Sequence, residues 1–127
     1  MGRCQVLIID DDQRTREAMG EIAARAGYLV TVRASGDGLE ELLASHEFTV
    51  AVIDYNLPQR SGLDIARSLR QYLPACRIVL ISSEYRPQYL DQEGTTLVDY
   101  FLAKPFSKQV FLDTLMTLCP HSDPTLD

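Results

Sequence analysis

Long hydrophobic runs, a targeting segment and an excess of basic residues are all missing from this 127-residue sequence. No apolar stretch approaches the ~20 residues of a membrane-spanning helix, and the amino terminus leads into a strand pattern instead of a signal peptide. The 12 basic residues are outnumbered by 18 acidic residues, and the net charge of −6 argues against nucleic acid as a direct partner. We therefore expect a cytoplasmic protein that contacts neither membrane nor nucleic acid.

Cysteine is scarce as well. The sequence has three cysteines, Cys4, Cys76 and Cys119, and no two of them lie at a metal-ligand spacing. The simplest interpretation of an odd number without such spacing is reduced thiols in a cytoplasmic protein.

Internal repeats and linkers to a second domain are also missing, and 127 residues suit one domain. A domain of this size buries roughly two-thirds of its unfolded surface, so it needs no metal or disulfide to fold. We expect residues 1–127 to form a single domain, with an ordered core of about residues 4–119 and a short, loose tail.

The sequence does contain unbroken apolar runs of four residues, which are typical of strands buried on both faces. They cover residues 6–9, 50–53 and 78–81, and weaker strand patterns cover residues 29–34 and 100–103. Between and after these runs, helical patterns cover residues 13–26, 39–46, 62–72, 87–93 and 108–118. The alternation predicts an α/β fold, a doubly wound (βα)5 sandwich whose five-stranded parallel sheet carries helices on both faces.

Polar residues follow four of these strands, namely Asp10-Asp11, Asp54, Ser82 and Lys104. The carboxyl ends of parallel strands lie at one edge of a sheet, so these groups should converge there. Carboxylates within a few ångströms of one another repel unless a cation joins them, and oxygen ligands suit Mg²⁺. With a lysine and a hydroxyl nearby, such a site suits a phosphoryl group, and Asp54 would be the nucleophile. We expect Asp12 to be a helix N-cap or a solvated neighbour, not a third ligand.

In this combination the sequence resembles the response-regulator receiver domains of two-component signalling, over nearly its whole length. The resemblance implies a sheet with strand order 2-1-3-4-5. The matching features are Asp10-Asp11 after the first strand, Asp54 with Pro58 four residues later, Gly62, Ser82 and the triplet Lys104-Pro105-Phe106.

The resemblance also implies roles for the residues at the predicted edge. Asp54 corresponds to the phosphoacceptor, and Lys104 corresponds to the phosphate-binding lysine, which precedes a peptide bond that is usually cis. Asp10, Asp11 and Asp54, with the backbone carbonyl of Asn56, correspond to the ligands of Mg²⁺ or Mn²⁺.

Two further positions correspond to the switch of the family. Ser82 matches the switch hydroxyl, and Phe101 matches the switch aromatic residue, which is often Tyr. Phe101 lacks the hydroxyl that Tyr would contribute, and the neighbouring Tyr100 leaves the assignment open by one residue. The output face would comprise residues 87–93, 100–103 and 108–118. We expect a short or irregular helix at 87–93, and a rearrangement of residues 84–98 on phosphorylation.

The expected function is therefore a phosphoacceptor switch that takes its phosphoryl group from a histidine kinase or a phosphotransfer protein. It would act on a downstream effector domain or protein, and homodimerisation is left open. It would not be an enzyme, apart from catalysing its own phosphorylation and dephosphorylation. One alternative is an interaction module that works without phosphorylation. The other is a haloacid-dehalogenase-type phosphatase, but Arg14 stands where that family has its last motif residue, and Asp54 would have no role.

Overall fold

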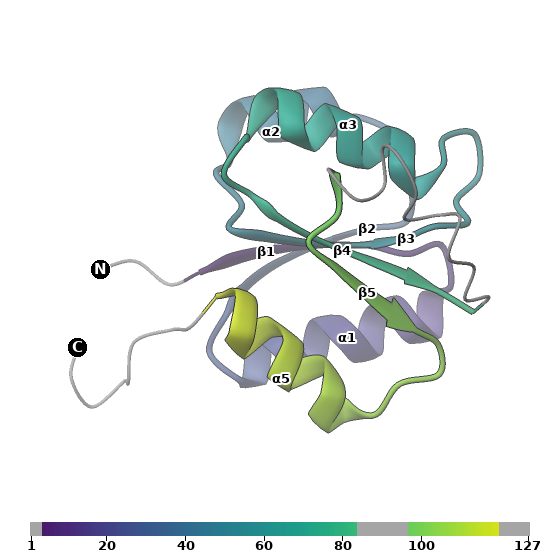
Figure 1. The fold of residues 1–127 in the computed structure, drawn as a ribbon, viewed down its shortest axis with the longest axis vertical. Helices are drawn as coiled ribbons and strands as arrows, with labels where there is room; N and C mark the ends of the chain where they lie inside the picture. Colours follow the sequence, from purple (N-terminus) through teal and green to yellow (C-terminus); the bar gives the residue numbers. More distant parts are fainter. Residues whose placement is uncertain (1–3, 84–96, 120–127) are drawn as a thin grey trace.

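The computed structural model of the protein describes residues 4–83 and 97–119. Its elements alternate along the chain as shown in Figure 1: β1 (Gln5–Ile9), α1 (Gln13–Arg25), β2 (Leu29–Arg33), α2 (Leu39–Ser45), β3 (Val50–Asp54), α3 (Gly62–Tyr72), β4 (Arg77–Ser82), β5 (Tyr100–Ala103) and α5 (Lys108–Leu118). Each of them lies within one residue of the bounds that the sequence predicts. The expected helix at 87–93 and most of the segment 84–98 lie outside the described residues.

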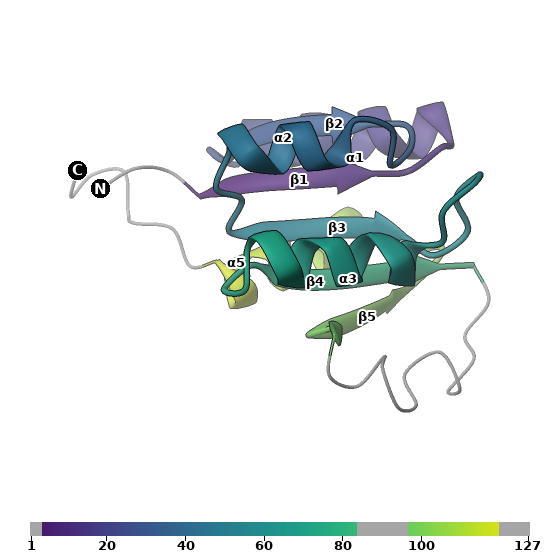
Figure 2. The same ribbon diagram turned by 90° about the horizontal axis from the view of Figure 1, so that it is seen from above.

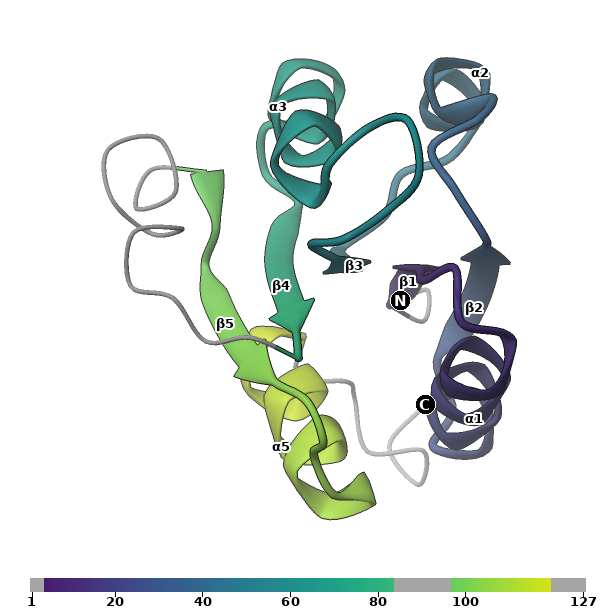
Figure 3. The same cartoon turned by 90° about the vertical axis from the view of Figure 1, so that its right-hand side faces the viewer.

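The five strands form one parallel sheet in the order β2-β1-β3-β4-β5, as expected (Figure 2). Figure 3 looks onto the carboxyl ends of the strands, with α2 and α3 on one face of the sheet and α1 and α5 on the other. The predicted doubly wound α/β fold is confirmed. Within the described part of the chain, no helix is long and apolar enough to cross a membrane.

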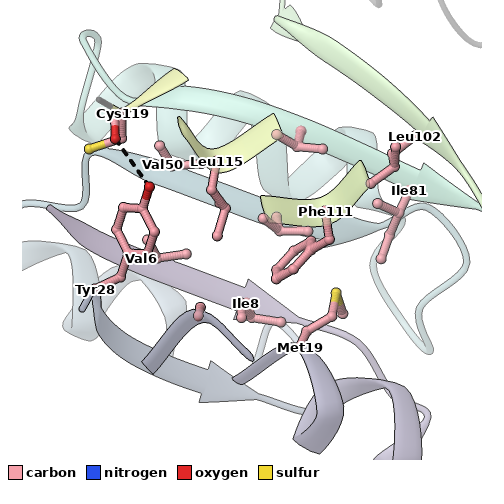
Figure 4. Packing of buried hydrophobic residues seen from close by; sticks show 13 residues of the cluster. Val6, Ile8, Met19, Tyr28, Val50, Ile81, Leu102, Phe111, Leu115 and Cys119 are labelled. Atoms are coloured by element: carbon pink, nitrogen blue, oxygen red, sulfur yellow. Dashed lines mark hydrogen bonds between the residues drawn. The ribbon is translucent and has the colours of Figure 1, made fainter. Parts of the chain in front are cut away.

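The sheet separates two apolar layers, and the two-residue period of a strand decides which side chain enters which layer. In β1, Val6 and Ile8 pack against α1 and α5 (Figure 4), whereas Leu7 and Ile9 pack against α2 and α3. All five residues of β3 are buried. A central strand that contributes to both layers has no polar face, which explains the continuous apolar runs in the sequence.

Three of the helices begin at a side chain that satisfies a free backbone N–H group. Asp12, Ser61 and Ser107 each accept a hydrogen bond from the backbone N–H three residues later. The chain leaves α1 through Gly27, whose φ of 101° is rarely adopted by other residues. Of the two roles expected for Asp12, the structure shows the helix N-cap.

The expectation of three reduced thiols is wrong for two of the cysteines. Cys4 and Cys119 form a disulfide, with their Cα atoms 6.5 Å apart. Cys4 precedes β1 and packs with the layer that Val6 and Ile8 enter, and Cys119 ends the buried stripe of Phe111 and Leu115 on α5. Cys76 is a free, buried thiol in the opposite layer, as expected of a core cysteine.

Candidate functional site

Three acids meet at the carboxyl end of the sheet because β1 and β3 are adjacent and parallel. Asp10 directly follows β1 and is fully buried, Asp54 is the last residue of β3 and is 5% exposed, and Asp11 is exposed. One carboxylate oxygen from each lies within 4.8 Å of those of the other two. The structure therefore brings together the three acids that the sequence predicts, at the predicted edge.

Lys104 supplies a positive charge in this cluster. Its Nζ lies 2.9 Å from Oδ2 of Asp10 and 3.6 Å from Oδ2 of Asp54. The lysine directly follows β5, its backbone N–H donates to the carbonyl of Ser82, and the peptide bond to Pro105 is cis, as the resemblance implies. Burial lowers the pKa of Lys104, but Asp10 and Asp54 outweigh this effect and raise that pKa above its ordinary value. Lys104 therefore remains charged at neutral pH.

The surroundings of Asp54 oppose its ionisation. Burial and, next, the negative charge of Asp10 raise its pKa from 3.8 to about 6. Lys104 and the backbone N–H of Asn56, which lies 3.3 Å from Oδ1 of Asp54, lower the pKa but only in part. Since three carboxylates face one ammonium group, the site carries an excess of negative charge.

The donor set fits a hard divalent cation. Oδ2 of Asp10 is buried and, apart from its ion pair with Lys104, accepts no hydrogen bond from any described residue. A buried carboxylate oxygen whose one partner is this ammonium group, and which lies close to two further carboxylates, can also bind a metal ion that prefers oxygen ligands, as Mg²⁺ does. The role of the Asn56 carbonyl stays a prediction.

The structure separates the two aromatic residues between which the switch position was left open. Tyr100 lines a groove against α5. Phe101 pairs with Leu80 in the register of β4 and β5. Leu80 and Ser82 are two residues apart in β4, so their side chains lie on the same face of the sheet. By strand alternation, Phe101 and Ser82 thus share one face of the sheet, and Tyr100 belongs to the other. Ser82 is fully buried and Phe101 is partly buried.

The neighbourhood of Asp10 includes contacts that the sequence did not reveal. The backbone N–H of Asp12 donates to Oδ1 of Asp10 at 2.9 Å, and the Arg16 guanidinium donates to the Asp10 carbonyl at 2.9 Å. The Asp12 carboxylate accepts hydrogen bonds from the hydroxyl and the backbone N–H of Thr15, which lower its pKa. Asp12 is therefore the N-cap of α1, and its backbone N–H holds the carboxylate of Asp10 in place. An Arg six residues after an Asp matches no sequence motif, so the contact between Arg16 and Asp10 could not be predicted from the sequence.

Gly62 owes its identity to the close approach of α3 to the end of β3. A Cβ atom at this position would lie 2.6 Å from the carbonyl oxygen of Asp54 and 2.9 Å from the Cα of Tyr55. The N–H of Gly62 also donates to the Tyr55 carbonyl at 2.9 Å. The glycine thus lets α3 begin directly against the backbone that carries the predicted phosphoacceptor.

The loop between β3 and α3 is fastened by Arg60. Its guanidinium donates to the Ser68 hydroxyl at 2.7 Å and lies 3.3 Å from Oε2 of Glu40 on α2. These partners are 8 and 20 residues away, so the sequence offered no signal for them. The loop that follows Asp54 is thereby held to both helices above that half of the sheet.

Comparison with known proteins identifies the same family over most of the chain. A family model described as the response regulator receiver domain matches residues 6–116. The transcriptional regulatory protein KdpE of Mycobacterium tuberculosis is 34% identical over 113 residues, which are 87% of this chain and 48% of KdpE. The chain spans less than half the length of each of the first curated relatives that it matches.

Solved structures show the same architecture. The chemotaxis response regulator CheY4 of Vibrio cholerae aligns with a TM-score of 0.82 at 26% identity, over 92% of this chain and 99% of that one. A response regulator protein from Burkholderia pseudomallei, solved with a phosphorylated aspartic acid, a calcium ion and citrate, aligns with a TM-score of 0.80 at 25% identity, over 90% of this chain and 67% of that one. On the fold, the edge cluster and these matches together, the chain belongs to the response-regulator receiver domain family.

Proposed function

We propose that this receiver domain accepts a phosphoryl group on Asp54 from the phosphohistidine of a histidine kinase or a phosphotransfer protein. The observation that carries the proposal is the placement of the Lys104 ammonium between the buried carboxylates of Asp10 and Asp54. A carboxylate oxygen of Asp54 attacks phosphorus, the new O–P bond forms as the N–P bond of the donor breaks, and the freed imidazole takes up a proton from solvent. Family membership leaves the phosphatase alternative without support.

The other residues of the site would divide the remaining tasks. The pKa of about 6 leaves Asp54 ionised, and therefore nucleophilic, at neutral pH. Lys104 would hydrogen-bond the transferred phosphoryl oxygens, and the Ser82 hydroxyl would approach them from the end of β4. Asp10, Asp11, Asp54 and the Asn56 carbonyl would hold Mg²⁺ or Mn²⁺, which supplies positive charge beside those oxygens when it is bound.

The response regulator from Burkholderia pseudomallei supports the assignment, because it was solved with a phosphorylated aspartic acid and a divalent cation together. This chain presents a buried aspartate within a cluster of carboxylate oxygens, which could take up a phosphoryl group and a divalent cation together. We infer that phosphorylation draws Ser82 toward Asp54 and that Phe101, on the same face of the sheet, moves into the vacated space.

The output surface would include the exposed side of β5 and α5. A groove of about 220 Å³ lies between Tyr100 and the α5 residues Val110, Asp113 and Thr117. Tyr100 and Val110 are 45% and 42% exposed, so large apolar side chains are accessible here. We propose that a downstream effector domain or protein docks on this surface in the cytoplasm. A second copy of the chain is the alternative occupant.

The test is phosphorylation by a small phosphodonor such as acetyl phosphate, in the presence of Mg²⁺. Intact-mass measurement should show one added phosphoryl group on the wild-type chain and none on Asp54→Asn. The matched control is Asp37→Asn, which removes an exposed acid from a turn outside the site and should leave uptake unchanged.

Uptake by the Asp54→Asn variant would overturn the assignment of the phosphoacceptor. A wild-type chain that takes up no phosphoryl group with either Mg²⁺ or Mn²⁺ would instead favour an interaction module that works without phosphorylation.

A further inference from the structure

The disulfide joins the amino end of β1 to the carboxyl end of α5, across 115 residues of sequence. Cys119 is also the C-cap residue of α5, where its N–H donates to the Leu115 carbonyl at 2.7 Å. Its own carbonyl accepts a hydrogen bond from the Tyr28 hydroxyl at 3.3 Å, as Figure 4 shows. The end of α5 is thus tied by a covalent bond to the residue before β1 and by one hydrogen bond to the residue before β2.

We propose that Cys4 and Cys119 form a reversible thiol–disulfide site that sets how firmly the end of α5 is held against the sheet, with a small thiol–disulfide couple such as glutathione as its reactant. Disulfides in reducing compartments are usually transient and redox-sensing, and nothing in this fold demands a permanent one. The layer between the sheet, α1 and α5 is already filled by large apolar side chains, so the domain keeps its core when the bridge is open.

The exposure of the two cysteines defines the route of exchange. Cys4 is partly exposed, whereas Cys119 is 2% exposed, so an external thiolate attacks the sulfur of Cys4. A bond forms between these two sulfurs, the bridge breaks, and the Cys119 sulfur leaves with the electron pair and takes up a proton. A second external thiolate then attacks the external sulfur of the mixed disulfide and releases Cys4. Two external thiols are thereby oxidised to one disulfide, and the bridge is reduced to two thiols.

The third cysteine is kept out of this exchange by its position. Cys76 is 2% exposed and belongs to the layer on the opposite face of the sheet from Cys119. Burial raises the pKa of its thiol to about 12, so the reactive thiolate is scarce at neutral pH. Cys4 and Cys119 are therefore partners by geometry, and Cys76 serves as an internal reference.

Opening the bridge should act at one end of the molecule only. Cys4 lies at the amino end of β1 and Asp10 at the carboxyl end, so the edge that carries Asp54 keeps its contacts in both redox states. The end of α5 would lose its covalent restraint, and the N–H group of Cys119 would exchange with solvent faster. The proposal does not depend on phosphorylation of Asp54.

The experiment equilibrates the full chain in buffers of graded reduced-to-oxidised glutathione ratio, followed by acid quench, alkylation of the unfolded chain in denaturant and intact-mass measurement. We expect three alkylated thiols at the reducing end, one at the oxidising end, and a Cys4–Cys119 cross-linked peptide in the oxidised digest. Hydrogen exchange at the last turn of α5 should be roughly tenfold faster in the reduced state, with little change in α3. Cys4→Ser should exchange like the reduced chain in every buffer, and Cys76→Ala should keep the full redox response.

Three alkylated thiols at every glutathione ratio would overturn the site itself. A bridge that survives the most reducing ratio would overturn its reversibility. Equal rates of hydrogen exchange at the last turn of α5 in the two redox states would overturn the role of the disulfide as a restraint on that helix.

Discussion

Replacement of Asp54 by asparagine should stabilise the metal-free protein at pH 8, although it removes the proposed phosphoacceptor. The ionised carboxylate is buried beside Asp10, and Lys104 compensates for only part of this cost. An asparagine has nearly the same shape and can still accept the hydrogen bond from the Asn56 N–H. It leaves Lys104 with its closer partner, since that ammonium lies 2.9 Å from Asp10.

The magnitude follows from the pKa of Asp54, which is raised from 3.8 to about 6 by burial and by Asp10. An acid whose pKa is higher in the folded state binds protons more tightly there, so the folded protein loses stability as the pH rises from about 4 through about 6. Each pH unit of this interval is worth about 1.4 kcal/mol, so the wild type loses at most about 3 kcal/mol. The variant lacks this titrating group and does not lose this stability. The free energies of unfolding of the two proteins should therefore differ least below pH 4.

The assay is thermal or urea unfolding in excess chelator at pH 4 and pH 8. We expect Asp54→Asn to melt about 3–10 °C above the wild type at pH 8, and the difference to shrink strongly at pH 4. Asp37→Asn, an exposed acid in a turn, is the matched control and should show no comparable change between the two pH values. An Asp54→Asn variant that melts at or below the wild type at pH 8 would refute the view that this cluster is in net repulsion.

Three further predictions follow from the same structure. Added Mg²⁺ should raise the melting temperature of the wild type, by an amount equivalent to about 2.7 kcal/mol at 100 times the dissociation constant, and should raise that of Asp54→Asn much less. Gly62→Ala should lower the free energy of unfolding by about 1–3 kcal/mol in urea, because its Cβ would lie 2.6 Å from the Asp54 carbonyl, whereas Gly20→Ala, in α1, should cost far less. Ser107→Ala removes the N-cap of α5 and should cost about 1 kcal/mol in the same assay, and an unchanged midpoint would show that this cap is dispensable.

The sequence predicted the fold and the edge cluster because both depend on local patterns. Apolar runs of four residues identified the buried strands, and the parallel connection of those strands brings their carboxyl ends to one edge. The acids at Asp10 and Asp54 and the lysine at Lys104 directly end or follow a strand, so their convergence required no knowledge of packing.

Contacts between residues that are distant in sequence were not predictable in the same way. The Arg70 guanidinium lies 2.6 Å from Oδ2 of Asp99, which also accepts a hydrogen bond from the N–H of Ile78, and the paired residues are 21 or 29 positions apart. The disulfide was missed for a related reason. An odd cysteine count suggested free thiols. Cys4 lies on the same face of the sheet as Val6 and Ile8, and Cys119 follows Leu115 by four residues at the end of α5, so both cysteines lie in one layer.

The electrostatics of the site connect its cost in stability with its proposed chemistry. Three carboxylates around one ammonium group leave the metal-free edge of the sheet negatively charged, and a phosphoryl group that approaches Asp54 is negatively charged as well. Without a further cation, the cluster would therefore repel its own substrate while it destabilises the fold. A divalent cation bound to these oxygens would relieve both effects at once, since it compensates the buried carboxylates and reduces the repulsion of the incoming group. Burial raises the pKa of Asp54 and repulsion by Asp10 raises it further, and this repulsion is expected to make phosphoryl uptake depend on the metal.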